Sequence, residues 1–248
     1  MQQEAMHYSR APITEAIVDI KVILSETLSA DKILEIHPHI LEHFPTTEPL
    51  YVDSLTVQAG PDIQVQTSRQ HNGFLFRSAD GKRIFQATLQ GFTFNLLAPY
   101  TSWEEFSSDA RYLWGIYKDI CKPASVTRVA VRYINQINIP VKGQIELREY
   151  LKIVPEVTPD LPQKNLSSFF MQLQIPQEDL NCMLVINETL TLPPSPEFIS
   201  IILDIDLFRQ QFWKSDDEDI WSFLTQLRDR KNLIFRKSIT EKTEELID

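Results

Sequence analysis

One stretch of the chain constrains the fold more than any other, the run VTRVAVRYINQI from Val126 to Ile137. It contains no Pro or Gly and is rich in β-branched residues, so it predicts a long β-strand. Because side chains alternate across a strand, Val129 and Val131 share one face and Arg128 and Arg132 share the other, about 13 Å apart at about 3.3 Å per residue. We therefore expect this strand to lie at the centre of the fold, with one apolar face and one basic face.

Alternating apolar residues, helical spacing and turn dipeptides predict the elements before this strand. A helix over Ser29–Phe44 is expected to be interrupted by Pro38, because proline lacks the amide proton that an interior helical position needs. A bulge at Gln90–Gly91 would explain a change of apolar phase within one long strand. The expected elements and turns are strands Ile13–Leu24, Leu55–Gln58, Ile63–Arg69 and Arg83–Leu97, turns at Asn72–Gly73 and Asp80–Gly81, and a helix from Trp103 to Tyr117 capped by Thr101 or Ser102.

The second part of the chain is predicted to run from the central strand, extended to Ile139, into a similar series of elements. Three prolines between Val154 and Asn165 indicate an irregular connection. The expected elements are a short helix Ile145–Ile153, strands Ser167–Ile175, Cys182–Thr189 and Glu197–Leu207, a helix Asp217–Lys237 capped by Ser215, and a short helix over Thr240–Asp248.

The order strand, helix, three antiparallel strands, helix thus occurs twice, which predicts an α+β fold of two similar halves, residues 1–122 and 123–248. The first strands of the halves are expected to join them into one sheet or an open barrel. Pairing these strands about Ile17 and Ala130 would place Glu15 opposite Arg132 and Asp19 opposite Arg128. The hypothesis is two cross-strand ion pairs that fix the register between the halves; the four structural ion-pair residues would be Glu15, Asp19, Arg128 and Arg132.

Composition limits the classes of function. The chain has 248 residues, 43% hydrophobic, and a formal charge of −10, which argues against general binding to nucleic acid phosphates. Cys121 and Cys182 are expected to be buried thiols, with neither a disulfide nor a zinc site. The segment Met1–Arg10 has no apolar core of a signal peptide, and no apolar run approaches a membrane span. We expect a cytoplasmic protein that does not engage a membrane.

Several short motifs together resemble an uncharacterised, sporadically distributed bacterial protein family of similar length. They are Arg10-Ala11-Pro12-Ile13-Thr14-Glu15-Ala16, Gln90-Gly91-Phe92, Pro99-Tyr100, Trp103-Glu104-Glu105-Phe106, and Arg128 with Val131-Arg132-Tyr133-Ile134-Asn135-Gln136-Ile137. The resemblance covers nearly the whole chain, from Pro12 to Phe235 and Ile239-Thr240. It implies a bacterial origin and a shared core that includes Pro12, Glu15, Arg128, Arg132, Tyr133 and Asn135. It carries over no catalytic residue.

Three histidines, His37, His39 and His43, lie within seven residues of one another, beside Glu35 and Glu42. At about 100° per helical residue His37 falls among apolar side chains, whereas the other two point to the polar side. The three rings do not converge, so no metal site is predicted.

Asp204 and Asp206 share a strand face and allow two interpretations. They could form a paired-carboxylate site with Glu188 or Asp19. They could instead line the solvated face of an antiparallel sheet, which alternates in the same way and is the favoured interpretation.

The arginines of the central strand also allow two interpretations. Arg128 and Arg132 with Lys21, and with Arg77 or Arg83, could hold a phosphate-bearing ligand, since guanidinium groups bind phosphate in a bidentate manner. Glu15 and Asp19 compete for the same groups, so internal ion pairing is favoured.

No motif for catalysis is found. With 6 glycines the chain has no phosphate-binding loop, and neither Gly-x-Ser-x-Gly nor His-Glu-x-x-His occurs. We expect a non-catalytic binding or assembly protein, without a cofactor, that engages a protein partner through a surface or cleft between the halves. Trp213 beside Lys214 is the candidate partner surface, and a homo-oligomer is left open. The alternative is a regulator that binds a phosphate-bearing small molecule, or a phosphoesterase-like enzyme, that uses the Arg128 and Arg132 face.

Overall fold

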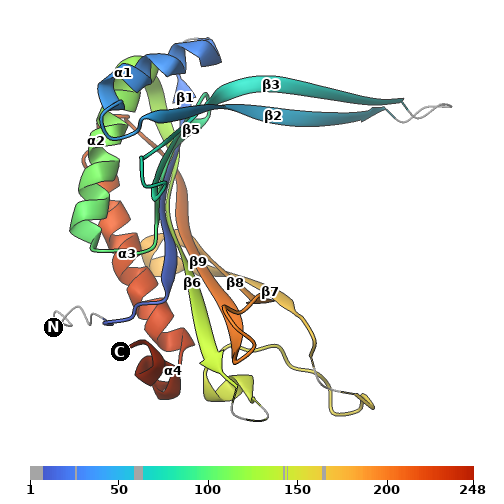
Figure 1. Cartoon of the computed structure of the whole chain (residues 1–248). Helices are drawn as coiled ribbons and strands as arrows, with labels where there is room; N and C mark the ends of the chain where they lie inside the picture. The colour runs from blue at the N-terminus through green and yellow to red at the C-terminus, as the bar shows by residue number, and fades with distance from the viewer. Residues whose placement is uncertain (1–7, 26, 59–63, 142, 144, 164–165) are drawn as a thin grey trace.

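The protein is an α+β fold built on one antiparallel sheet of nine strands, with helices packed on one face of that sheet (Figure 1). The computed structural model describes residues 8–25, 27–58, 64–141, 143, 145–163 and 166–248. The strand order is β2-β3-β4-β5-β1-β6-β9-β8-β7. The strands are β1 (Ile13–Leu24), β2 (Thr46–Gln58), β3 (Gln64–Arg77), β4 (Arg83–Thr88), β5 (Gly91–Leu97), β6 (Pro123–Pro140), β7 (Phe170–Gln177), β8 (Cys182–Thr191) and β9 (Phe198–Trp213).

Two long helices lie against one face of the sheet, α2 behind the first part of the chain and α3 behind the second (Figure 1). Ser102 caps α2 as predicted, because its hydroxyl accepts a hydrogen bond from the backbone N–H of Glu105 at 3.1 Å. Pro38 does interrupt the first helical segment, which is a 3-10 turn followed by a single α-turn. The helical elements are η1 (Ala30–Ile36), α1 (His37–Ile40), α2 (Trp103–Cys121), η2 (Leu147–Glu149), η3 (Glu178–Leu180), α3 (Asp219–Ser238) and α4 (Glu241–Ile247).

The two predicted first strands pair antiparallel at the centre of the sheet, β1 against β6. The sheet is continuous through this junction. The register differs from the predicted one by two residues, because Ile17 lies opposite Arg132 and Asp19 lies opposite Ala130. A shift of two residues keeps every side chain on its predicted face, so Arg128 and Arg132 still share a face with Asp19.

One predicted turn and the predicted bulge are different in the structure. Asn72–Gly73 lies inside β3, at an irregularity opposite Leu50 and Tyr51 of β2. A Cβ at Gly73 would lie 2.1 Å from the carbonyl oxygen of Ala87, so the glycine serves a close approach of two strands. The expected bulge at Gln90–Gly91 is instead the end of a tight hairpin in which Thr88 pairs with Gly91, so the single predicted strand is two strands. The turn at Asp80–Gly81 is confirmed.

The series of elements after the central strand is also corrected. The helix expected over Ile145–Ile153 is only the 3-10 turn η2, and α3 begins after Glu218 without a side-chain cap from Ser215. Strand β9 continues to Trp213, six residues beyond the predicted end. Four strands follow β1 and three follow β6, so the two halves do not have the same number of strands. Within the strands, helices and connection predicted above, Ile63, Lys164 and Asn165 lie outside the described residues.

One hydrophobic core fills the space between the sheet and the helices. The strands contribute every second residue, such as Val18 and Ile20 from β1 and Val129, Val131 and Tyr133 from β6, all fully buried. Cys121 and Cys182 are buried free thiols, as predicted. In the part of the chain that the structure describes, no helix has both the length and the apolar character needed to span a bilayer.

Candidate functional site

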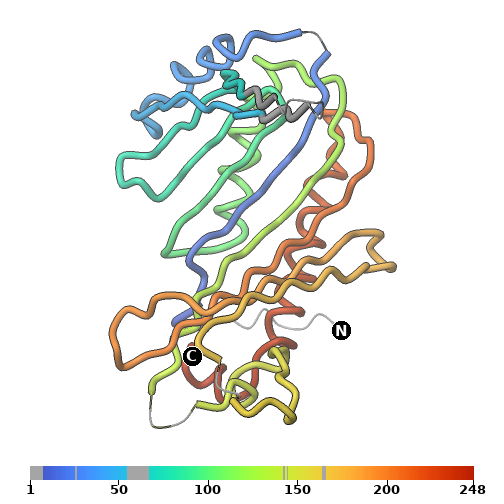
Figure 2. Tube along the Cα trace, turned by 90° about the vertical axis from the view of Figure 1, so that its right-hand side faces the viewer, coloured from blue at the N-terminus to red at the C-terminus, as the bar shows by residue number. Residues whose placement is uncertain are grey.

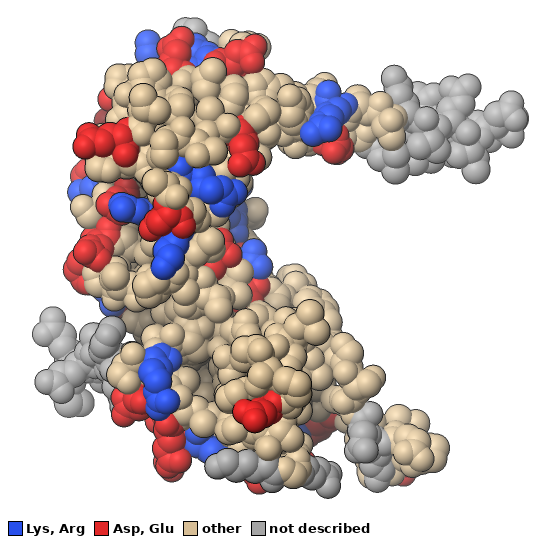
Figure 3. Space-filling view, viewed as in Figure 1, with Lys and Arg blue, Asp and Glu red and all other residues tan. Residues whose placement is uncertain are grey.

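The face of the sheet opposite the helices is open, and the molecule curves around it (Figures 1 and 3). The β2–β3 hairpin projects on one side of this face, and the β7–β8 end of the sheet curves forward on the other (Figure 1). Figure 2 looks onto the open face, with the helices behind the sheet. A set of polar side chains, which we call the open-face network, comes from seven consecutive strands of the sheet, β4 to β7 in the strand order above. Its members are Glu15, Asp19, Lys21, Gln86, Thr93, Asn95, Arg128, Arg132, Gln172, Gln174, Asn187, Asp204 and Asp206.

Arg128 joins three strands at the centre of this network. Its Nη1 donates to Asp19 of β1 at 2.7 Å, and its Nη2 lies 3.4 Å from Asp206 of β9. Its guanidinium also lies over the ring of Phe208, 4.4 Å from the centroid. Lys21 contacts the same Asp19 at 2.9 Å. The guanidinium is held between two carboxylates and an aromatic ring, with the side chain 22% exposed.

Arg132 does not pair with Glu15, as the sequence had predicted. It forms a bidentate pair with Asp204, from Nε at 2.8 Å and Nη2 at 2.7 Å, and this pairing raises the pKa of the guanidinium. The register explains the change of partner, because Glu15 lies opposite Ile134 rather than opposite Arg132. The predicted contact between Asp19 and Arg128 is present, and the second predicted ion pair is replaced.

A hydrogen-bond ladder continues from Asp204 to the last strand of the sheet. Asn187 of β8 donates to Asp204 at 2.9 Å, Gln172 of β7 donates to Asn187 at 2.8 Å, and Gln174 donates to Gln172 at 3.3 Å. Because Asn187 and Gln172 each donate one hydrogen bond and accept another, a continuous series of side-chain hydrogen bonds crosses β6, β9, β8 and β7.

A similar ladder runs in the other direction from β1. Asn95 of β5 donates to Glu15 at 2.6 Å, and Gln86 of β4 donates to Asn95 at 3.4 Å. Thr93 of β5 donates to the second oxygen of Asp19 at 2.8 Å. Glu15 therefore accepts its hydrogen bond from the first half of the sheet, and the two ladders end on either side of the β1–β6 junction.

The charges of the network nearly cancel. Four carboxylates (Glu15, Asp19, Asp204 and Asp206) face three cations (Lys21, Arg128 and Arg132). Burial raises the pKa of Asp206 to about 6, against the opposing effect of Arg128 and Arg132. One of the oxygens of this carboxylate is buried and has no hydrogen-bond partner among the residues that the structure describes. The network thus offers little excess positive charge to an anion.

Lys21, Arg128 and Arg132 of the predicted phosphate site lie on the same open face, where Lys21 and Arg128 contact the same Asp19. Arg83 contacts Asp109 of α2 at 3.3 Å, on the covered side of the sheet, and so lies apart from Arg128 and Arg132. Both central guanidinium groups already contact carboxylates. A phosphate would have to displace Asp19 from Arg128 or Asp204 from Arg132.

The predicted carboxylate pair of Asp204 with Glu188 does not form, because Glu188 lies on the covered face, opposite Leu203 and Met171. It is fully buried, its two oxygens have no hydrogen-bond partner among the described residues, and burial raises its pKa to about 7. The sequence signal that could have identified Glu188 is its phase, because it falls on the same side of the strand as the apolar Leu184, Ile186 and Leu190.

A buried cation lies elsewhere on the covered face. The ammonium of Lys231 of α3 lies 3.7 Å from the centroid of the Tyr133 ring. Burial, together with the smaller effect of the nearby charge of Arg228, lowers the pKa of Lys231 to about 7. The Tyr133 hydroxyl is 3.1 Å from that of Tyr100, and burial raises the pKa of both phenols.

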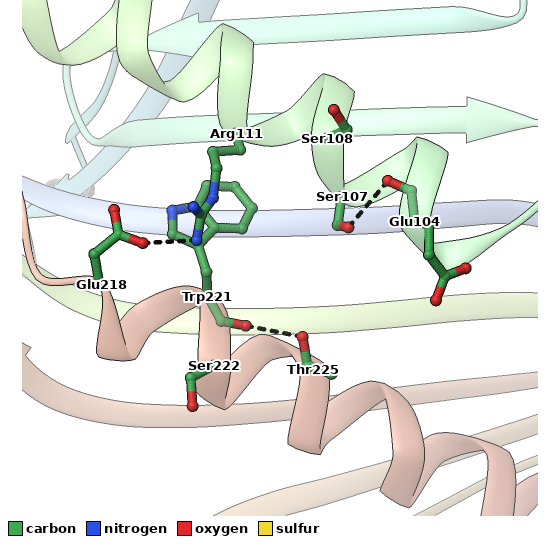
Figure 4. A pocket seen from close by; sticks show the side chains of 8 residues that line it. All are labelled: Glu104, Ser107, Ser108, Arg111, Glu218, Trp221, Ser222 and Thr225. Carbon is green, nitrogen blue, oxygen red and sulfur yellow. Dashed lines mark hydrogen bonds and ion pairs between the residues drawn. The ribbon is translucent and has the colours of Figure 1, made fainter.

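A second candidate site is a groove of about 510 Å³ between α2 and α3, on the convex side of the molecule (Figure 4). Arg111 of α2 crosses it to Glu218 at 2.8 Å, and its guanidinium lies 5.2 Å from the ring centroid of Trp221. Hydroxyl groups make up much of the remaining lining, from Ser107, Ser108, Ser222 and Thr225. Its one arginine is paired, so the groove shows an interhelical clamp rather than a charged binding site.

The other predicted residues are placed as follows. Trp213 is buried and packs on Phe223, with ring centroids 6.4 Å apart, so its indole is not available as a partner surface. His37 stacks on Phe76, and its Nε2 is 3.2 Å from the carbonyl oxygen of Phe44. Within the described ranges, no group of three or more His, Cys, Asp or Glu side chains is arranged to hold a metal ion.

Comparison of the chain with protein-family models, with curated proteins and with solved structures gives no match. The resemblance to a bacterial family stays a prediction.

Proposed function

We propose that this chain is a non-catalytic binding or assembly protein that receives a protein partner on the open face of its sheet. The observation that supports this most is the open face itself, which spans the nine-stranded sheet and is not covered by any helix of the described residues. An antiparallel sheet can leave one face in contact with solvent, and a face of this extent offers a large surface to a partner.

The chemistry of the face favours a protein over an anionic ligand. Its charges are paired with one another, while amide side chains such as Asn95 and Gln172 stand beside apolar Ile17, Ile134 and Val185. The core of a protein–protein interface is depleted in unpaired charged groups, and a face of this composition meets that condition. Paired ions in the centre add specificity, because a partner must not disturb their geometry.

An internal duplication is part of this proposal. Counting outward from the β1–β6 junction, the order β1, β5, β4, β3 corresponds to β6, β9, β8, β7, and each series is followed by one long helix. Each half also carries an amide ladder that ends on a carboxylate near the junction, Glu15 or Asp204. Duplication around a pseudo-twofold axis would give the concave face two related walls and a partner that spans both.

Site-specific photo-cross-linking in cells that produce the protein tests the proposal. A photoreactive residue at Gln136 of β6 or at Gln86 of β4 would probe the open face, and one at the exposed Asp119 of α2 would be the control. We expect one discrete protein adduct from both open-face positions and none from Asp119. Adducts that form only from α2 would contradict the proposal.

Thermal unfolding of the same protein in the presence of phosphate distinguishes this function from the phosphate-binding alternative. Because Arg128 and Arg132 are already paired, we expect millimolar inorganic phosphate to leave the unfolding temperature unchanged. A phosphate-dependent increase that is lost in Arg132→Met would favour the alternative instead.

A further inference from the structure

We propose that β7 is a self-association edge, through which two copies of this chain pair their β7 strands antiparallel about a twofold axis. The inference does not depend on the proposed function, because the pairing uses the backbone groups on the outer side of β7, although Gln172 and Gln174 of this strand also belong to the open-face network. Among the described residues no strand lies beyond β7, so the backbone groups on its outer side have no strand partner. Another extended strand, with its own backbone N–H and C=O groups, would form hydrogen bonds with these groups.

The sequence of β7 lacks the features that usually protect an edge. Natural edge strands are blocked by charged side chains, above all lysine, or by bulges. The segment FMQLQIPQ from Phe170 to Gln177 contains no charged residue, and it pairs with β8 without a bulge. Pro176 is its only protective residue, and it lies at the end of the strand. The opposite edge, β2, carries Glu48 and Asp53.

A second copy fits this edge in one register better than a strand of arbitrary sequence would. Pairing centred on Leu173 places Leu173 opposite its own copy and Met171 opposite Ile175, all on the covered side of the sheet. On the open side the same register places Gln172 opposite Gln174 in both directions. Like groups therefore meet like groups on both faces, which is the condition for a twofold, self-complementary interface.

The distribution of charge over the molecule also favours self-association at β7. The chain carries a formal charge of −10, so two copies repel each other over most of their surface. The end of the sheet formed by β7 and β8 is largely free of charged side chains (Figure 3). Exposed apolar area is present on β7, with Phe170 69% and Ile175 38% exposed.

The amide ladder gives the two copies continuity across the new junction. Gln172 and Gln174 already hydrogen-bond to each other and lead to Asn187 and Asp204. In the dimer each Gln172 would meet Gln174 of the second copy, so the ladder would cross from one copy to the other. Eight residues form a small interface, so we expect a dissociation constant of about micromolar order.

The test uses charge exchange on the full chain, measured by sedimentation velocity at about 1 to 100 µM. The double variant Gln172→Lys/Gln174→Lys brings four lysines together in the proposed register, and Gln172→Glu/Gln174→Glu brings four glutamates together. We expect each variant alone to dissociate at least about tenfold more readily than the unchanged chain, and an equimolar mixture to restore dimers. The matched control is Gln210→Lys/Gln211→Lys, on the exposed end of β9, which should leave the dimer intact.

Restoration in the mixture is the decisive result, because it requires opposite charges to meet across two β7 strands. A chain that is monomeric throughout this range would overturn the proposal, as would a dimer that survives both double variants. A dimer that both variants break but that the mixture does not restore would also overturn it. None of these results bears on the photo-cross-links from Gln136 and Gln86.

Discussion

The two faces of the central sheet treat charged side chains in opposite ways. On the open face each cation has a carboxylate partner, as Arg132 has Asp204. On the covered face Glu188 has no hydrogen-bond partner among the described residues, and the ammonium of Lys231 rests on an aromatic ring. The open-face carboxylates are also largely buried, Asp204 to 4% exposure, but each of Asp19, Asp204 and Asp206 contacts an arginine. Glu188 and Lys231 are instead buried without an ion partner in the described part of the chain and are driven toward their neutral forms. A buried charge with an ion partner therefore costs the fold less than one without.

The largest expected effect comes from removing the centre of the open-face network. Arg128→Met leaves Asp19 and Asp206 close together without their shared cation. We expect the free energy of unfolding at pH 7 to fall by about 3 kcal/mol, because uncompensated and partly buried carboxylates are costly. Urea denaturation measures this change.

The control for that experiment is Lys21→Met, which removes a cation that contacts the same Asp19 but is 42% exposed. We expect at most about 0.5 kcal/mol for it. Equal losses from both variants would mean that Arg128 contributes no more than an ordinary surface charge.

The covered face should respond with the opposite sign. Lys231→Met removes a buried cation whose pKa is lowered from 10.5 to about 7. The unfolded chain takes up this proton as the pH falls below about 10.5, while the folded chain does so only near 7, so Lys231 costs stability progressively over that window. We expect the variant to be more stable by about 2–3 kcal/mol at pH 7, with the difference shrinking toward pH 10.

Lys237→Met on the exposed side of the same helix is the matched control, and it should change stability by less than about 0.5 kcal/mol at either pH. If Lys231→Met were destabilising at pH 7, the contact with the Tyr133 ring would outweigh the cost of burial.

A smaller gain is expected from the buried carboxylate. The pKa of Glu188 is raised from 4.5 to about 7, so the folded chain keeps a proton that the unfolded chain releases between these values. Its stabilising contribution is complete below about pH 4.5 and is lost as the pH rises through 7. Glu188→Gln should therefore stabilise the protein by about 2 kcal/mol at pH 8 and by almost nothing at pH 4.5. The same substitution at the exposed Glu197 should show no such pH dependence.

The contrast between the faces also separates what the sequence could predict from what it could not. Alternation within the Val126–Ile137 run correctly placed Arg128 and Arg132 on one face and the core residues on the other, because the period of a strand does not depend on its neighbours. The antiparallel pairing of β1 with β6 was predicted as well. Register was not, since a shift of two residues preserves every face and the local sequence contains no signal against it.

That shift decides which charges meet. It moves Glu15 away from Arg132, whose partner comes from β9, some 70 residues further along the chain. The amide ladders depend on strand order across the whole sheet, which short-range patterns do not encode. The sequence predicted a local turn at Gly73 and a bulge at Gly91. In the structure both positions need glycine because a Cβ there would collide with a backbone carbonyl oxygen of a neighbouring strand.

The smallest effect we predict tests whether the open-face ladder acts as a unit. Asn187→Ala removes one hydrogen bond to Asp204 but leaves the bidentate contact with Arg132, so we expect a loss of about 1 kcal/mol. Asn187 and Arg132 share Asp204, so their effects should not add. A double-mutant cycle with Arg132→Met should give a coupling energy of about 0.5–1 kcal/mol. Strict additivity would show that Asp204 holds its two partners independently, and the network would then be a set of separate contacts rather than one connected feature of the open face.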